Sequence, residues 1–247
     1  YQSTLQLMKK VFEIFKWFML LSVIVLLMAF SIKNQKKGNC QAFNVIVVSS
    51  ENHFINDKII NDLLRSKNLH PFGKTKVEIA MDEIEKSIGN HPAIKQINAY
   101  CDIAGNVSVE ILQRNPIARV VTTNNSFYID ENGKRMPLSK VYTARTLVIT
   151  GNVHFMEKGD LFLLAKFIAE NPFWKAQIMQ IHAENNGDLI LIPRVGYHQI
   201  VFGKPIDISE KFSKLKLMYE KGISEKRWNH YSQINLKFKN QIVCTKE

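Results

Sequence analysis

The feature that most constrains this chain is a run of 16 residues without a charge, from Trp17 to Ile32. At about 1.5 Å per residue, a helix of this length spans roughly 24 Å. The hydrocarbon core of a bilayer is about 30 Å thick, and Lys16 can reach the interface along its aliphatic stem. The sequence therefore predicts one transmembrane helix over residues 17–32. The residues assigned to this anchor are Trp17, Leu20, Val23, Leu27 and Phe30.

Two other interpretations of this segment remain open. A cleavable signal peptide needs a small-x-small cleavage site, and Ala29-Phe30-Ser31 is a poor version of that pattern. A lipoprotein needs apolar and small residues before its cysteine, whereas Lys37-Gly38-Asn39 precede Cys40. Both comparisons favour an uncleaved anchor. Charge does not set its orientation, because three lysines lie on each side of it: Lys9, Lys10, Lys16, Lys33, Lys36 and Lys37.

Composition excludes several classes of protein. The chain is 46% apolar and 22% charged, which is ordinary for a globular protein and argues against disorder or a multi-span channel. Its net charge of +11 is not evenly spread, because residues 1–39 carry six lysines and one glutamate around the apolar run. The rest of the chain is only mildly basic and has no stripe of basic and aromatic residues, so nucleic-acid binding is not indicated. Seven scattered histidines and three cysteines without CxxC spacing predict no metal or cofactor. Cys40, Cys101 and Cys244 are expected to be unpaired, partly buried thiols.

The pattern after a polar linker over residues 33–42 predicts a βααββ unit over residues 43–113. A β-branched strand at 43–49 is followed by a helix that begins at Asn56-Asp57. A second helix is expected with Val77, Met81, Ile84 and Ile88 on one face. Strands at 94–103 and 107–111 flank a turn.

Residues 114–247 predict a β-rich domain with two helices, so the fold class is α+β. Strands are expected at 117–123, 126–129, 147–150, 176–183, 189–193, 199–202 and 232–238, the last continuing toward Val243. A helix near 158–170 is closed by Asn171-Pro172. The other covers 207–221, with Asp207 and Glu210 as a capping box.

Local signatures of catalysis are missing from the sequence. There is no HExxH, GxSxG, phosphate-binding loop or GxGxxG motif. Asp82, Glu83 and Glu85 fit the solvent face of an amphipathic helix, and Asp130-Glu131 fit a turn. The sequence therefore favours a protein without enzymatic activity, although a site assembled from distant residues stays open.

Three stretches carry a resemblance to a known family. The first is Ile88–Ile94. The second is Gln113-Arg114-Asn115-Pro116-Ile117-Ala118, which is close to the family pattern E-R-x-P-x-A. The third is Ile234-Asn235-Leu236-Lys237-Phe238, which is close to the family pattern I/V-D-L-R-Y. In this order they resemble the FtsQ/DivIB family of bacterial division proteins, in a Bacteroidetes-like form. The βααββ unit resembles a POTRA module. Gln113 and Asn235 depart from the family's acids, which puts local hydrogen bonds in doubt.

The resemblance implies a scaffold in the inner membrane at the division septum, with residues 1–16 cytoplasmic and the bulk periplasmic. It implies FtsB-like and FtsL-like partners, with other division proteins at the POTRA-like domain. Strand 232–238 is expected to be a sheet edge that accepts a partner strand. The expected partner-binding residues are Leu236, Phe238, Asn240, Ile242, Val243, Thr245 and Lys246. The alternatives are a POTRA protein of outer-membrane assembly or secretion and an anchored envelope enzyme.

Overall fold

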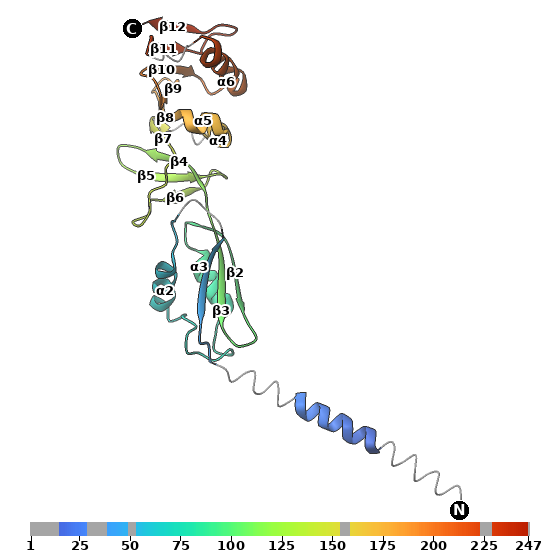
Figure 1. The fold of residues 1–247 in the computed structure, drawn as a ribbon. Coiled ribbons are helices and arrows are strands. Elements are labelled where there is room, and N and C mark those ends of the chain that lie inside the picture. The colour runs from blue at the N-terminus through green and yellow to red at the C-terminus, as the bar shows by residue number, and fades with distance from the viewer. Residues whose placement is uncertain (1–14, 29–38, 49–52, 154–158, 223–228, 247) are drawn as a thin grey trace, which may run out of the picture. The chain divides into compact units, whose positions relative to one another are not determined.

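The computed structural model describes residues 15–28, 39–48, 53–153, 159–222 and 229–246 (Figure 1). Its contacts divide the chain into two compact units. Unit 1 comprises residues 1–49 and 55–112, and unit 2 comprises residues 50–54 and 113–247. Each unit has its own sheet.

The predicted anchor lies partly within the described residues. Residues 15–28 form a helix whose side chains are exposed, and this helix carries Trp17, Leu20, Val23 and Leu27. In the part of the chain that the structure describes, no helix combines the length and the apolar character needed to span a bilayer. Phe30 and most of the predicted tail and linker lie outside the described residues.

Unit 1 has the predicted βααββ order. Its sheet has the order β1-β3-β2, and β1 runs parallel to β3. The side chains of β3 that are fully buried are Val107, Val109 and Ile111. The elements are β1 (Phe43–Val48), α2 (Asp57–Ser66), α3 (Met81–Gly89), β2 (Ile94–Cys101) and β3 (Val107–Gln113).

The two helices of unit 1 begin for different reasons. The Asn56 side chain accepts a hydrogen bond from the Ile59 amide at 3.0 Å, which caps α2 at the predicted position. The predicted start of the next helix at Val77 is wrong. Thr75 and Glu78 close a turn, in which the Glu78 amide donates to the Thr75 carbonyl at 2.9 Å. Val77 is therefore 73% exposed, and α3 begins only at Met81.

Unit 2 is a mixed sheet with the order β12-β11-β10-β9-β8-β7-β4-β5-β6. The pairs β4–β7, β7–β8 and β10–β11 are parallel. The strands are β4 (Pro116–Val121), β5 (Ser126–Asp130), β6 (Arg135–Pro137), β7 (Leu147–Gly151), β8 (Ile178–Ala183), β9 (Leu189–Pro193), β10 (Gln199–Gly203), β11 (Tyr231–Asn235) and β12 (Val243–Lys246).

Helices cover one face of this sheet (Figure 1). They are α4 (Asp160–Glu170), α5 (Pro172–Gln177) and α6 (Ile208–Leu217), and a π-helical turn (Met218–Gly222) follows α6. Between helices and sheet lies one apolar core, which includes Leu164, Trp174 and Phe212 from the helices and Ile149 and Ile234 from the strands.

Two predicted helix boundaries in unit 2 are wrong. Asn171-Pro172 ends α4 but also starts α5, because the Asn171 side chain caps the new helix and proline is favourable in a first turn. Residues 176 and 177 therefore lie in a helix and not in a strand, and unit 2 has one helix more than predicted. Asp207 forms no capping box, since its φ is 52° and its side chain makes no cap bond. Glu210 instead lies 3.5 Å from the Lys214 ammonium.

The α5 cap supports a stability prediction. The Asn171 Oδ1 atom accepts hydrogen bonds from the amides of Phe173 at 3.1 Å and Trp174 at 3.2 Å. Asn171→Ala leaves both amides without this acceptor, so we expect the free energy of unfolding to fall by about 1 kcal/mol. Urea denaturation measures the change. Asn171→Asp keeps an acceptor and should lose much less; equal losses in the two variants would contradict the capping role.

Candidate functional site

The outermost strand of unit 2 is β12, not the segment that the sequence predicted. Strand β12 pairs antiparallel with β11, with Cys244 opposite Ile234 and Val243 opposite Asn235. The prediction that 232–238 forms the edge is therefore wrong. The chain reverses at Asn240, whose φ is 64°, and the returning strand covers β11. On the other side of β12 no strand is paired within the described residues.

The predicted partner-binding residues divide by burial. Leu236 is fully buried, and its amide donates to the Val201 carbonyl at 2.9 Å. Its assignment to the partner surface is corrected, because its side chain belongs to the core. Phe238 is 46% exposed and Val243 is 43% exposed. Ile242 is half-buried against the core, and three residues are exposed: Asn240, Thr245 and Lys246.

The predicted alternation of side chains fails after Leu236. Ile234 and Leu236 both face the core, but β11 ends at Asn235 and Phe238 lies in a bend. The Asn235 side chain accepts a hydrogen bond from the Lys237 amide at 3.0 Å. An aspartate oxygen could accept the same hydrogen bond, so the asparagine does not remove this local contact.

Two lysines hold the segment between β11 and β12. The Lys237 ammonium donates to the Asp188 carboxylate at 2.7 Å, and the Lys214 ammonium donates to the Phe238 carbonyl at 3.1 Å. Asp188 is mostly buried in the turn before β9. The sequence analysis missed Asp188 and Lys214. Their partners are 49 and 24 residues away, so no local pattern marks them.

The Asp188–Lys237 bond makes stability depend on pH. The hydrogen bond from Lys237 is the largest influence on Asp188 and holds the pKa of that carboxyl below its usual value. A lowered pKa in the folded state means that stability is present above the unfolded pKa, about 3.9, and is lost as pH falls through the folded value.

We therefore expect Asp188→Asn to flatten the acid limb of the stability profile below about pH 4. Urea midpoints of the two proteins between neutral and acidic pH measure this. Lys237→Met removes the same bond from the other side and should flatten this limb less, because the Lys204 ammonium remains 3.7 Å from Asp188 Oδ1. An unchanged acid slope in Asp188→Asn would exclude this pair as its source.

The two edges of the large sheet differ in a way that bears on function. At the far edge, β6 has three residues, ends in Pro137 and carries exposed Arg135. Short strands, charge and proline are ways in which proteins block unwanted strand pairing. Strand β12 (Val243–Lys246) has four residues and ends in Lys246, but it contains no proline, so every one of its main-chain amides can donate a hydrogen bond. Its main chain is therefore the better template for an added strand.

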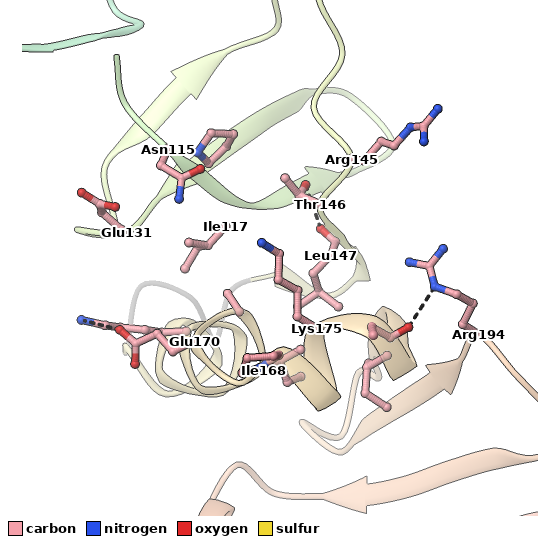
Figure 2. A pocket seen from close by; sticks show the side chains of 16 residues that line it. Asn115, Ile117, Glu131, Arg145, Thr146, Leu147, Ile168, Glu170, Lys175 and Arg194 are labelled. Atoms are coloured by element: carbon pink, nitrogen blue, oxygen red, sulfur yellow. Dashed lines mark hydrogen bonds and ion pairs between the residues drawn. The ribbon is translucent and has the colours of Figure 1, made fainter. Parts of the chain in front are cut away.

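A second feature of unit 2 is a hollow of about 530 Å³ between β4, β7 and helices α4 and α5 (Figure 2). Its apolar wall includes Ile117, Leu147, Ile168 and Ile178. In this view the carboxylates of Glu131 and Glu170 lie on one side, and Arg145 and Arg194 lie on the other. The Lys175 side chain extends into the space between them.

The polar groups of this hollow are partly committed to the fold. Arg194 donates through Nε to the Ala176 carbonyl at 3.0 Å, and Lys166 lies 3.7 Å from Glu170. Among the residues that line it, Thr146 carries the one hydroxyl, and histidine and cysteine do not occur. The hollow can receive a small polar or acidic group, and its charged side chains are two glutamates, two lysines and two arginines.

The acidic and cysteine side chains that the sequence analysis considered for catalysis or metal binding include Asp130 and the three cysteines. Asp130 is buried, and its Oδ1 accepts from the amides of Asn132 and Lys134 at 2.9 and 2.8 Å, as a turn residue does. All three cysteines fall within the described residues and are free thiols. Within those residues, no group of histidine, cysteine and acidic side chains is placed to hold a metal ion.

Comparison with known families covers both units. A family model described as FtsQ/DivIB, C-terminal related, matches residues 115–245, just over half of the chain. A second, described as a POTRA-like domain, matches residues 38–112. No curated protein matches the chain. The first match includes β11, β12 and the segment between them.

Proposed function

This chain belongs to the FtsQ/DivIB family, as its motifs predicted, and we propose that it is a non-enzymatic scaffold of the division complex. Its partners are FtsB-like and FtsL-like single-span proteins, which it links to septal peptidoglycan synthesis. One partner adds a strand to β12. The POTRA-like unit contacts other division proteins.

The observation that carries this proposal is the outer edge of β12, which pairs with no further strand among the described residues and lies beside two exposed apolar side chains. In strand addition, main-chain hydrogen bonds supply affinity and alternating side chains supply specificity. Phe238 and Val243 are each nearly half exposed, and the Phe238 carbonyl is held by Lys214. A partner strand along β12 would cover both side chains while the main chain beneath them stays in place.

We further propose that residues 17–32 anchor the chain in the inner membrane, with residues 1–16 cytoplasmic and the remainder periplasmic at the septum. The helix over 15–28 supports this, because it presents Trp17, Leu20 and Leu27 outward and buries none of them. A helix that is apolar all round needs an apolar environment. Mass spectrometry of the mature protein tests retention, and a soluble form beginning near residue 31 would contradict it.

Co-purification tests the scaffold proposal directly. The tagged full chain is expressed with FtsB-like and FtsL-like proteins of the same cell and purified from detergent-solubilised membranes. We expect both partners to co-purify in fixed ratio. A variant with residues 239–246 deleted provides the control, since it lacks the edge strand. Recovery of neither partner with the full chain, or equal recovery with the deletion variant, would overturn the proposal. Turnover of peptidoglycan by the purified chain would instead indicate an enzyme.

A further inference from the structure

One end of unit 1 brings two loops together around the segment that leads to the anchor. The Cys40 amide donates to the Lys74 carbonyl at 2.8 Å, and the Gly73 amide donates to the Cys40 carbonyl at 2.9 Å. The Ala42 amide donates to the Asn106 side chain at 3.0 Å. We call this the tether end; it comprises residues 39–42, the loop 71–78 and the β2–β3 turn 102–106 (Figure 1).

The tether end exposes three large apolar side chains. Phe72 is 64% exposed, Val77 is 73% exposed and Ile103 is 80% exposed. Phe72 adjoins Gly73, Val77 lies in the turn that Thr75 closes, and Ile103 follows Asp102, whose carbonyl is 3.5 Å from the Lys76 ammonium. Turns in water favour small and polar residues. Three exposed apolar residues in the turns of two loops therefore indicate a surface that something covers.

The length of the connecting chain limits how far the tether end can lie from the membrane. Six residues, 33–38, separate the proposed end of the anchor from Asn39. Fully extended, they span at most about 22 Å. The tether end is thus confined near the membrane surface, and a short tether gives it a high effective concentration there. Aromatic and aliphatic side chains partition into the interfacial region of a bilayer.

The charges of the tether end are balanced. Lys74 and Lys76 face two acids, Glu78 and Asp102, both of which are held in their own turns by hydrogen bonds from Thr75 and Asn106. The tether end itself therefore adds little attraction to anionic lipid, whereas the three lysines of residues 33–38 attract it from the connecting chain. The contribution of the apolar side chains should change little with salt, in contrast to that of the lysines in the connecting chain.

We propose that Phe72, Val77 and Ile103 insert into the headgroup region of the membrane that the chain's own anchor crosses, docking unit 1 on the lipid surface. The proposal rests on the membrane anchor of the proposed function. It assigns to unit 1 a lipid contact in addition to its protein contacts. It also gives a reason for apolar residues at turn tips where folding needs none.

Spin labels on the full chain in lipid nanodiscs test the proposal. Single labels are placed at Phe72→Cys, Val77→Cys and Ile103→Cys, with Cys101 and Cys244 replaced by serine and buried Cys40 retained. Val48→Cys is the matched control, because Val48 is also exposed, at 46%, but lies at the opposite end of β1. Power saturation compares access of oxygen, which concentrates in lipid, with that of a water-soluble nickel complex.

We expect labels 72, 77 and 103 to favour oxygen at least several-fold more than label 48, at low and high salt alike. Labels at 72 and 103 as accessible to nickel as label 48 would overturn the docking. Spin–spin broadening that appears only with two chains per disc would overturn it in favour of contact with a second copy. Flotation with vesicles separates the two proposals: a chain that does not float refutes the anchor, whereas a floating chain with water-exposed labels refutes only the docking.

Discussion

Phe212→Ala should lower the free energy of unfolding of unit 2 by about 3–5 kcal/mol, a large part of a typical domain's stability. Phe212 is 1% exposed and lies at the centre of an aromatic cluster between α6 and the sheet. Its ring centroid is 4.6 Å from that of Trp174, 4.9 Å from that of Phe167 and 5.5 Å from that of Phe202. Truncation removes contacts with three rings at once and leaves a cavity that rigid neighbours cannot fill.

Urea denaturation followed by tryptophan fluorescence measures this loss, because Trp174 borders the cavity. Phe173→Ala is the matched control: Phe173 precedes Trp174 on the same short helix but is 43% exposed. We expect it to cost less than about 1 kcal/mol, as exposed positions usually do. A loss for Phe212→Ala no larger than that for Phe173→Ala would mean that α6 does not complete the core of unit 2.

Local patterns in the sequence were sufficient to predict the order of helices and strands in unit 1. Its helices carry strong periodicity, and Asn56 caps α2 where the sequence places it. The sequence did not predict the parallel pairing of β1 with β3, because α2, α3 and β2 all lie between these two strands in the chain. The start of α3 was misplaced, because the Thr75–Glu78 bond that closes the preceding turn has no hydrophobic period to mark it. The strand predicted at 94–103 was also too long, since β2 ends at Cys101 and Ile103 lies in a turn.

Unit 2 was less predictable because long-range contacts decide its details. Leu236 and Phe238 are two residues apart, as side chains on one face of a strand are, and both are apolar. Nevertheless Leu236 is fully buried, whereas Phe238 is 46% exposed. The difference arises where Lys237 reaches Asp188 and the chain leaves the sheet. Strand β12 was not separable from β11 by periodicity, since only the reversal at Asn240 shows that two strands are present. The order of the motifs predicted the family, but the exposure of each side chain in the structure was needed to decide which predicted residues lie at the partner surface.

The second large expected effect is that of surface mutations at this edge on partner capture. We expect Phe238→Ala to weaken binding of the FtsB-like partner by about 30-fold, the change that corresponds to loss of roughly 2 kcal/mol at a buried aromatic anchor. Val243→Glu should abolish capture, because strand addition would bury its carboxylate against the partner without a counter-charge. Both side chains are nearly half exposed in the free protein, so neither change should remove much of the core.

Leu236→Ala separates a binding role from a folding role at this edge. Leu236 is two residues from Phe238 but fully buried, so its truncation should cost about 2–5 kcal/mol of stability. Affinities are measured by titrating the detergent-solubilised chain with the partner, and melting temperatures are measured on the same samples. Loss of capture at unchanged melting temperature in Phe238→Ala and Val243→Glu, beside a lowered melting temperature in Leu236→Ala, is the pattern that a docking edge requires. A lowered melting temperature in all three variants would place Phe238 and Val243 in the core. Normal capture by both surface variants would exclude β12 as the partner site and leave the family's binding surface to be sought elsewhere on the chain.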